Sequence, residues 1–414
     1  MVADQTKERK RAIIGLIVCL IANTSAAGAD WCTSALVDIA NTFPDVSYSM
    51  ITLVNNIPNL CAVIFTIVAG ALVNRKISLK TMMLLGIGMH CVGGVLPAFS
   101  GANSFSALLL GRFAFGIGYG IMQGICISMS FKLVTNEKLR TSAMGWALTA
   151  QYATNMVAQV VVGYLCEVKW NYSFLVYAWS LIPFLTVLLL CPKFPLDKDD
   201  RTALGGAESS LGKTETLGQS LKAMPKTVWI FSVIVGLYMV CYYPMFLCIG
   251  RVIIGRGFGT PVSIGYAMTF YSISSLLGGL LFGWIAGKTK HYTLFIALLG
   301  VAVSAAGIYF STSFAMVCVF LAIGGCTSTC ILPACNNSYF NEVPASRSFL
   351  ASSITLAGLN IGAFLGTPYI SLVTAFGGQA ETALLISPII LIIMGIITIP
   401  LSRQVVKGNE NTLS

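Results

Sequence analysis

Two charged side chains lie inside otherwise apolar stretches of this 414-residue chain. Asp30 and Arg112 each sit in a run that is long enough to cross a bilayer as a helix. A charge near the bilayer centre costs at least ~2.5–3.5 kcal/mol, so such residues mark function or a specific partner. At 1.5 Å of rise per residue, both lie at a similar depth near the same membrane face. Since an arginine favours an ionised carboxylate and burial favours a neutral one, such a pair could take up and release a proton.

The same two residues have other interpretations. Asp30 and Arg112 could form a structural ion pair, or Asp30 could lie in water at the membrane face. In the proton-coupling hypothesis, a conformational change separates or hydrates the pair and drives proton uptake on one side and release on the other.

Amide and phenol side chains recur at helical spacing and form candidate solute contacts. Gln151, Asn155 and Gln159 stand at i, i+4 and i+8, which places three amides on one helical face. Because amides both donate and accept hydrogen bonds, such a stripe suits a polar solute. The alternative is interhelical hydrogen bonding, worth only ~0.6 kcal/mol on average. The complete set of candidate substrate-binding residues is Asn23, Asp30, Arg112, Gln151, Asn155, Gln159, Tyr238, Tyr242 and Asn360.

The elements that must position these residues are membrane helices. Hydrophobic residues make up 56% of the chain and charged residues only 10%, against roughly 25% charged in a soluble domain. This composition excludes a soluble globular protein, a disordered one and a nucleic-acid binder. Backbone groups in lipid must be bonded internally, so we expect an all-α membrane protein with twelve spans. The expected spans are 13–36, 48–72, 79–99, 105–130, 142–166, 173–191, 227–249, 262–286, 293–311, 314–338, 347–375 and 380–401.

The basic residues predict how the chain is oriented. The net charge is +10, and 21 of the 25 Lys and Arg residues fall in the segments on the side of the two termini. By the positive-inside rule both termini are cytoplasmic, and we expect a multi-pass protein of the bacterial inner (cell) membrane. The polar stretch 192–226 is predicted to be a cytoplasmic linker. It would join an N-terminal six-helix bundle, 1–191, to a C-terminal one, 227–414.

Two motifs connect the chain to a known family. The segment Gly70–Lys80 resembles the basic loop after the second span of major facilitator superfamily transporters, with Asn74 where that family usually has an acid. The fourth run, 110–120, carries an R-x-x-x-G-x-G pattern that is similar to the same family. The resemblance covers nearly the whole chain and implies two pseudo-symmetric six-helix bundles that alternate access. It also implies a gating loop containing Gly70, Asn74, Arg75 and Lys80.

The resemblance further implies that spans one and four line a central cavity. Several proton-coupled members of the family place a carboxylate in span one and an arginine in span four, as Asp30 and Arg112 stand here. The fifth span lacks the Gly-Pro pair of the family's drug/proton antiporters.

We therefore predict a secondary active transporter, a proton-coupled symporter that acts as a monomer in the lipid bilayer. Its substrate is a small organic solute, with an organic anion or a polar neutral metabolite favoured. The alternative is a proton-driven exporter of drugs or other lipophilic cations, in which Asp30 binds the cation directly. No HExxH, GxSxG or paired intramembrane carboxylates occur, so we expect no enzyme, and we expect no cofactor, metal or nucleic-acid partner.

Further polar residues have simpler predicted roles. Glu167 and Glu381, at helix ends, are predicted to be solvated, and His90 to be a hydrogen-bonded packing residue. Arg251 and Arg256 lie near the predicted outer mouth, where they could attract anions or anchor at headgroups. Glycines at spacing four predict close helix contacts in three spans. These ladders are 116/120/124, 279/283/287 and 358/362/366.

Overall fold

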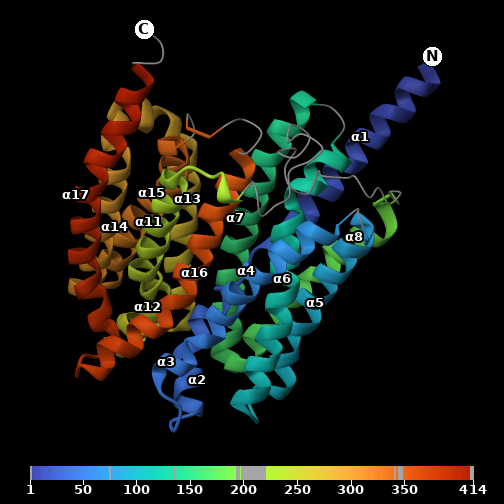
Figure 1. Ribbon diagram of the computed structural model, residues 1–414. Coiled ribbons are helices and arrows are strands. Elements are labelled where there is room, and N and C mark those ends of the chain that lie inside the picture. The colour runs from blue at the N-terminus through green and yellow to red at the C-terminus, as the bar shows by residue number, and fades with distance from the viewer. Residues whose placement is uncertain are drawn as a thin grey trace.

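The computed structural model describes residues 2–73, 76–134, 137–192, 196, 221–339, 342–343 and 348–410. Within these ranges the chain is helical throughout and contains no β-strand, which confirms the predicted all-α fold (Figure 1). The N-terminal helices are α1 (Val2–Asn23), α2 (Leu36–Thr42), α3 (Tyr48–Ile51), α4 (Leu53–Leu72), α5 (Leu79–Ser100), α6 (Phe105–Leu133), α7 (Glu137–Val168) and α8 (Leu181–Leu190). The C-terminal helices are α11 (Lys226–Tyr242), α12 (Pro244–Gly255), α13 (Pro261–Thr289), α14 (Thr293–Phe310), α15 (Phe314–Tyr339), α16 (Ser348–Ala375) and α17 (Ala383–Glu410).

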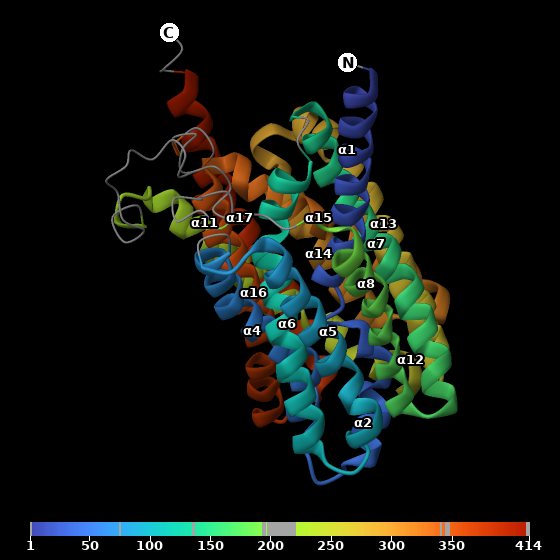
Figure 2. The ribbon, with the colours of Figure 1, turned by 90° about the vertical axis from the view of Figure 1, so that its right-hand side faces the viewer.

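Helices α1–α8 and α11–α17 form two groups that lie side by side (Figure 1). The start of α1 and the end of α17 lie at one end of the molecule, which we call the terminal end, and α2 and α3 lie at the distal end (Figure 2). The groups meet where α4 packs on α16 and where α7 packs on α13. Both contacts run along helices that carry candidate site residues.

Ten segments of the described chain are long and apolar enough to cross a membrane. One of them, Pro261–Phe310, contains both α13 and α14, and α7 is not among the ten. Helix α7 carries the predicted amide stripe, and its polar side chains lower its hydropathy. Counting α13, α14 and α7 separately is consistent with the twelve predicted spans.

The first span is broken, although the sequence predicts one continuous helix over 13–36. Helix α1 ends at Asn23, and after a short 3₁₀ turn the chain is not helical from residue 27 to 30. Helical structure resumes with the 3₁₀ turn Trp31–Ala35 and then α2. Gly28 has a φ of 104°, a backbone conformation that glycine adopts without steric cost. Asp30 therefore lies on an unwound segment and not on a helical face.

In the seventh span α11 ends at Tyr242 and α12 begins at Pro244, whose ring lacks the backbone donor of a continuous helix. Two of the three glycine ladders make the close contacts that their spacing predicts. A Cβ at Gly120 would lie 2.9 Å from the Ala62 Cα of α4, and one at Gly362 would lie 2.1 Å from a backbone oxygen of α11. The third ladder does not: a Cβ at Gly283 would meet nothing within 4 Å, so that prediction is wrong.

Candidate functional site

The unwound segment 27–30 is held by side chains from four different elements. Each of its four successive carbonyl oxygens accepts a hydrogen bond or pairs with a polar side-chain atom. Helices α5, α6 and α7 and the 3₁₀ helix Trp170–Ser180 each contribute one partner. The pairs are His90 Nε2 with Ala27 O at 3.1 Å, Tyr177 Oη with Gly28 O at 2.6 Å, Arg112 Nη2 with Ala29 O at 2.6 Å, and Gln159 Nε2 with Asp30 O at 3.3 Å. Gly28 O and Asp30 O also accept bonds from the local backbone donors Trp31 N and Thr33 N. At Ala27 and Ala29 the side-chain partners take the place of the bonds that an intact helix would have supplied, which explains how the break persists.

Arg112 is the centre of this arrangement. Its side chain is fully buried, and all three of its nitrogens donate hydrogen bonds. Besides Ala29 O, they reach Val54 O of α4 at 2.6 Å and Tyr177 Oη at 2.9 Å. The guanidinium also lies 4.4 Å from the centre of the Phe115 ring, a cation–π contact. Arg112 therefore binds backbone in the N-terminal half.

Asp30 and Arg112 do not form a direct ion pair in this conformation. The guanidinium is used by the carbonyl groups that the break exposes, one of them belonging to the residue before Asp30. The residue Asp30 has intermediate exposure, and its carboxylate interacts electrostatically with Arg112 and with three tyrosines. Of these, Tyr119 belongs to the N-terminal half, whereas Tyr243 and Tyr271 belong to the C-terminal half. Asp30 therefore lies where the two halves meet.

The amide stripe of α7 faces the broken span. Asn155 Oδ1 accepts a hydrogen bond of 2.6 Å from Trp31 Nε1. Gln159 is buried, and its Oε1 has no hydrogen-bond partner among the described residues. Gln151 is partly buried, two turns nearer the terminal end. Gln159 therefore contacts the unwound segment at Asp30 O, and Asn155 contacts Trp31, the residue that follows the segment.

The remaining candidate residues lie in different settings. Tyr238 and Tyr242 stack with ring centres 5.6 Å apart and are both buried, and the Tyr242 hydroxyl has no hydrogen-bond partner in the described chain. Asn360 of α16 donates to Gln123 Oε1 of α6 at 3.5 Å, which links the two halves. Asn23 donates to Cys19 O in its own helix at 2.8 Å and is buried, so its amide nitrogen does not point to a solute.

Sequence reasoning missed several residues of this site. Trp31 and Tyr177 stack with ring centres 5.3 Å apart beside the unwound segment. Trp31 is the direct neighbour of Asp30 in the sequence, a signal that could have drawn attention to it. Tyr177 lies in an apolar run without any special spacing, so only the fold brings it to the segment. His90 has the packing role that we predicted, with Nδ1 2.7 Å from Ser180 Oγ.

The two halves are also joined nearer the distal end. Asn59 of α4 donates to Tyr243 Oη at 2.9 Å. Thr367 Oγ1 of α16 accepts a hydrogen bond of 2.5 Å from Asn56 Nδ2 of α4. The same oxygen is hydrogen-bonded to Thr52 Oγ1 at 2.7 Å. A state that is open at the distal end has to break these contacts.

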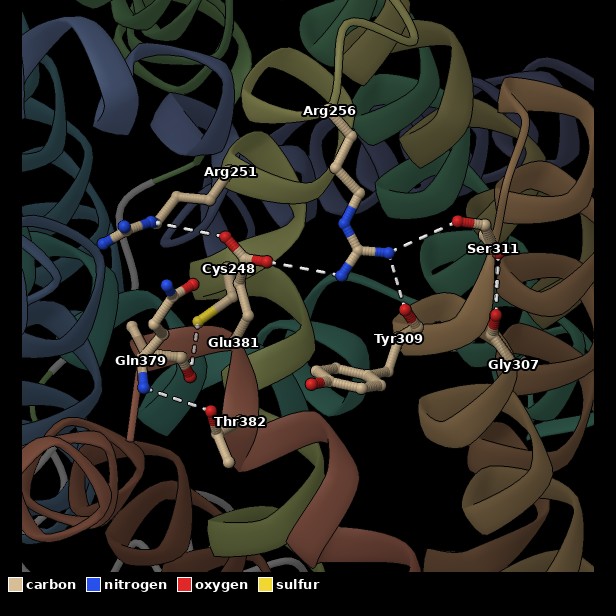
Figure 3. A network of polar contacts seen from close by, with 10 residues as sticks. Cys248, Arg251, Arg256, Gly307, Tyr309, Ser311, Gln379, Glu381 and Thr382 are labelled. Atoms are coloured by element: carbon tan, nitrogen blue, oxygen red, sulfur yellow. Dashed lines mark hydrogen bonds and ion pairs between the residues drawn. The ribbon is translucent and has the colours of Figure 1, made fainter. Parts of the chain in front are cut away.

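A polar network at the distal end contains Arg251, Arg256 and Glu381 (Figure 3). The Glu381 carboxylate lies 3.5 Å from Arg251 Nε and 3.4 Å from Arg256 Nη2. Its side chain is only 14% exposed, so the prediction of a solvated Glu381 is wrong. The two guanidinium groups compensate for its burial. Glu167, by contrast, is exposed as predicted and accepts a hydrogen bond from Thr260 Oγ1 at 2.8 Å.

Comparison with known proteins agrees with this architecture. The family model described as Major Facilitator Superfamily matches residues 18–250 and 229–412. The chain belongs to the major facilitator superfamily. No curated protein matches the chain. Among solved structures, this superfamily member resembles a variant of the nucleoside transporter NupG with a TM-score of 0.72 and 13% identity, covering 94% of this chain and 99% of that one.

Two further solved structures share the superfamily fold. A POT family transporter in complex with 5-aminolevulinic acid matches with a TM-score of 0.72 and 12% identity, covering 94% of this chain and 96% of that one. A D-xylose-proton symporter matches with a TM-score of 0.70 and 13% identity, covering 94% and 97%. Identities this low establish the fold and not the substrate. As a superfamily member, the chain is a multi-pass membrane protein and a secondary transporter of a small molecule.

In the loop after the second span, Lys80 binds the end of another helix in its own half. Lys80 Nζ donates to Leu188 O and to Cys191 O, both at 2.8 Å, and so caps the C-terminal end of α8 in the same half. Gly70 lies near the end of α4 and faces open space. Asn74 and Arg75 lie outside the described residues. A gating role for this loop stays a prediction, and the described contacts of Lys80 do not reach the other half.

Proposed function

We propose that this transporter is a proton-coupled symporter of a small polar organic solute and that Asp30 carries the proton. The observation that supports this most is the position of Asp30, a residue of intermediate exposure on an unwound segment between two halves, for which no ion-pair partner occurs among the described residues. A carboxylate at membrane depth is a functional residue by default.

The surroundings of Asp30 supply a coupling mechanism. The backbone bonds of segment 27–30 come from N-terminal elements, so this segment moves with the N-terminal half. Tyr243 and Tyr271 belong to the C-terminal half and change position relative to Asp30 when the halves rock. A group whose surroundings differ between two states has a different proton affinity in each, and that difference couples the proton to the motion.

The side chains near Asp30 favour an uncharged polar solute over an organic anion. Three tyrosines couple electrostatically to the carboxylate and the Gln159 amide binds the Asp30 backbone oxygen, so groups that both donate and accept hydrogen bonds predominate here. The one buried guanidinium, Arg112, already donates to three acceptors and has no nitrogen without a partner. The argument for an organic anion at this site, which used Arg112, is thereby weakened.

A second candidate is the proton-driven export of a lipophilic cation. The observation that favours it is the electrostatic coupling of the Asp30 carboxylate to three aromatic residues, Tyr119, Tyr243 and Tyr271, since aromatic faces attract cations. An exporter would confer resistance to cationic dyes on cells that express it, whereas a symporter would accumulate its solute.

The proposal includes the orientation and organisation predicted from the sequence. The termini are cytoplasmic, the membrane is the bacterial inner membrane and the protein acts as a monomer. The two bundles comprise residues 1–191 and 227–414, and most of the linker 192–226 lies outside the described residues. A cysteine placed after residue 410 and probed with a membrane-impermeant reagent tests the orientation.

The experiment uses the purified protein reconstituted into proteoliposomes. A thermal-shift screen with sugars, nucleosides, organic acids and cationic dyes first identifies a stabilising solute. Uptake of that solute is then measured with and without an imposed pH gradient for wild type, D30N and the matched carboxylate control D38N. We expect D30N to lose gradient-driven accumulation but to retain solute exchange at equal pH, and D38N to behave as wild type. Full gradient-driven accumulation by D30N contradicts the proposal.

A further inference from the structure

A cavity of ≈760 Å³ lies at the distal end, and Asp30 is not among the residues that line it. Both halves line it: Asn41 and Tyr48 come from the N-terminal half, and Arg251, Arg256 and Glu381 from the C-terminal half. Its volume falls within the range of about 300–1,000 Å³ that is typical of small-molecule sites. The polar network of Figure 3 forms one wall.

The charges on this wall do not cancel. Arg251 and Arg256 share the single carboxylate of Glu381, which leaves one net positive charge. Arg256 is fully engaged, because its Nη1 also donates to Tyr309 O at 2.6 Å and to Ser311 O at 3.3 Å. Arg251 contacts Glu381 only through Nε, and its two terminal nitrogens have no hydrogen-bond partner in the described chain. The unbalanced charge therefore belongs to the terminal nitrogens of Arg251.

The Arg251 guanidinium is held in place on two sides. Its Nε is fixed by Glu381, and its plane lies 4.6 Å from the centre of the Tyr48 ring. Tyr48 is itself anchored, because its hydroxyl donates to Leu247 O of α12 at 2.6 Å. Figure 3 shows the terminal nitrogens on the side of the guanidinium that faces away from Glu381. A planar fork with two donors in fixed positions matches the two oxygens of a carboxylate.

We propose that this cavity binds a small organic carboxylate from the aqueous phase through the terminal nitrogens of Arg251. The site is separate from the Asp30 site and does not depend on the function proposed for it. Because its walls come from both halves, a bound carboxylate stabilises the conformation in which the distal ends are together.

The test uses the full-length protein in nanodiscs of phosphatidylcholine, with benzoate as the probe and calorimetric titration as the readout. Arg251→Gln removes the fork, and we expect binding to weaken at least tenfold. Lys169→Gln is the matched control, because Lys169 is an exposed cation at the same end that does not line the cavity. We expect the control to bind benzoate as wild type does. Equal binding by wild type and Arg251→Gln, or no binding by wild type, overturns the proposal.

Two further variants keep the test decisive if Arg251→Gln fails to fold. Glu381→Gln removes the competing carboxylate and raises the net charge by one, so we expect at least threefold tighter binding. Arg251→Lys keeps the charge but loses the fork, so we expect intermediate affinity. Weaker binding by Glu381→Gln contradicts the charge argument.

A lipid phosphate could supply a similar anionic group to Arg251. The titration is therefore repeated in nanodiscs that contain phosphatidylglycerol. Benzoate affinity that is the same in both nanodiscs supports an aqueous ligand, whereas its loss in phosphatidylglycerol assigns the site to a lipid and overturns the proposal. D30N should bind benzoate normally, so the two proposals can fail separately.

Discussion

Replacing Arg112 by methionine distinguishes a backbone-binding role for this residue from an ion pair with Asp30. Methionine approximates the length of the arginine stem and removes every donor. The hydrogen bonds to Ala29 O and Val54 O are then lost, and both oxygens are left in a buried environment. Tyr177 still donates to Gly28 O, so its hydroxyl keeps one partner.

The magnitude follows from those two acceptors. A buried polar group left without a partner costs about 1–3 kcal/mol, which gives about 2–6 kcal/mol for two carbonyls. Removing a buried charge offsets part of this cost, so we expect a net loss of about 2–4 kcal/mol in the free energy of unfolding. D30N breaks no ion pair and should cost less than about 1 kcal/mol. If the pair existed, removing one partner would cost about 3–5 kcal/mol.

The assay is SDS-induced unfolding of purified protein in mixed micelles for wild type, D30N, R112M and the double variant. The four free energies form a double-mutant cycle that isolates the direct interaction. We expect a coupling energy below about 0.5 kcal/mol, since charges that do not touch interact weakly in partly hydrated surroundings. A coupling energy above about 1 kcal/mol, or a larger loss in D30N than in R112M, would refute the backbone-binding role.

Three further predictions concern packing, closure and the loop after the second span. Gly362→Ala should lower the free energy of unfolding, measured by thermal unfolding, by about 1–3 kcal/mol because the new Cβ would overlap α11. Gly283→Ala is the control: its Cβ meets open space, so the free energy of unfolding should change by less than about 0.5 kcal/mol. Tyr243→Phe removes the bond from Asn59, worth about 1 kcal/mol, and the longer one to Asn55 O, and should raise hydrogen exchange where α11 meets α12 roughly fivefold, while unchanged exchange contradicts a closing role. Lys80→Ala should lower stability by about 0.3–1 kcal/mol but leave the uptake rate unchanged, whereas slower uptake would support gating.

The fold could be predicted from the sequence because hydropathy and backbone bonding in lipid leave few alternatives. The predicted runs 79–99 and 105–130 lie within α5 and α6, and α12 begins at Pro244. The break in the first span was missed. Residues 24–30 are all apolar or small except Asp30, and nothing in their hydropathy shows that four other elements supply partners for the backbone.

The site was predicted in part. Spacing placed Asn155 and Gln159 on one face, and charge in an apolar run identified Asp30 and Arg112. The partner of Arg112 could not be predicted, because a carbonyl oxygen that accepts a hydrogen bond has no sequence signature. The prediction that Glu381 is solvated was wrong for a related reason. Its two partners, Arg251 and Arg256, come from a distant part of the sequence, and only the tertiary fold brings the three residues together.

The broken first span also constrains how the protein can be made. A segment with unbonded carbonyl groups cannot rest alone in lipid, because each such group costs several kcal/mol there. Gly28 O and Asp30 O have local donors, but the partners of Ala27 O and Ala29 O reside on α5 and α6, which are synthesised later. During synthesis, this part of the segment must therefore stay helical, remain hydrated or be sheltered by an insertion factor until the fourth span has emerged. The first span to be translated thus reaches its final conformation only after later helices of its bundle are in place.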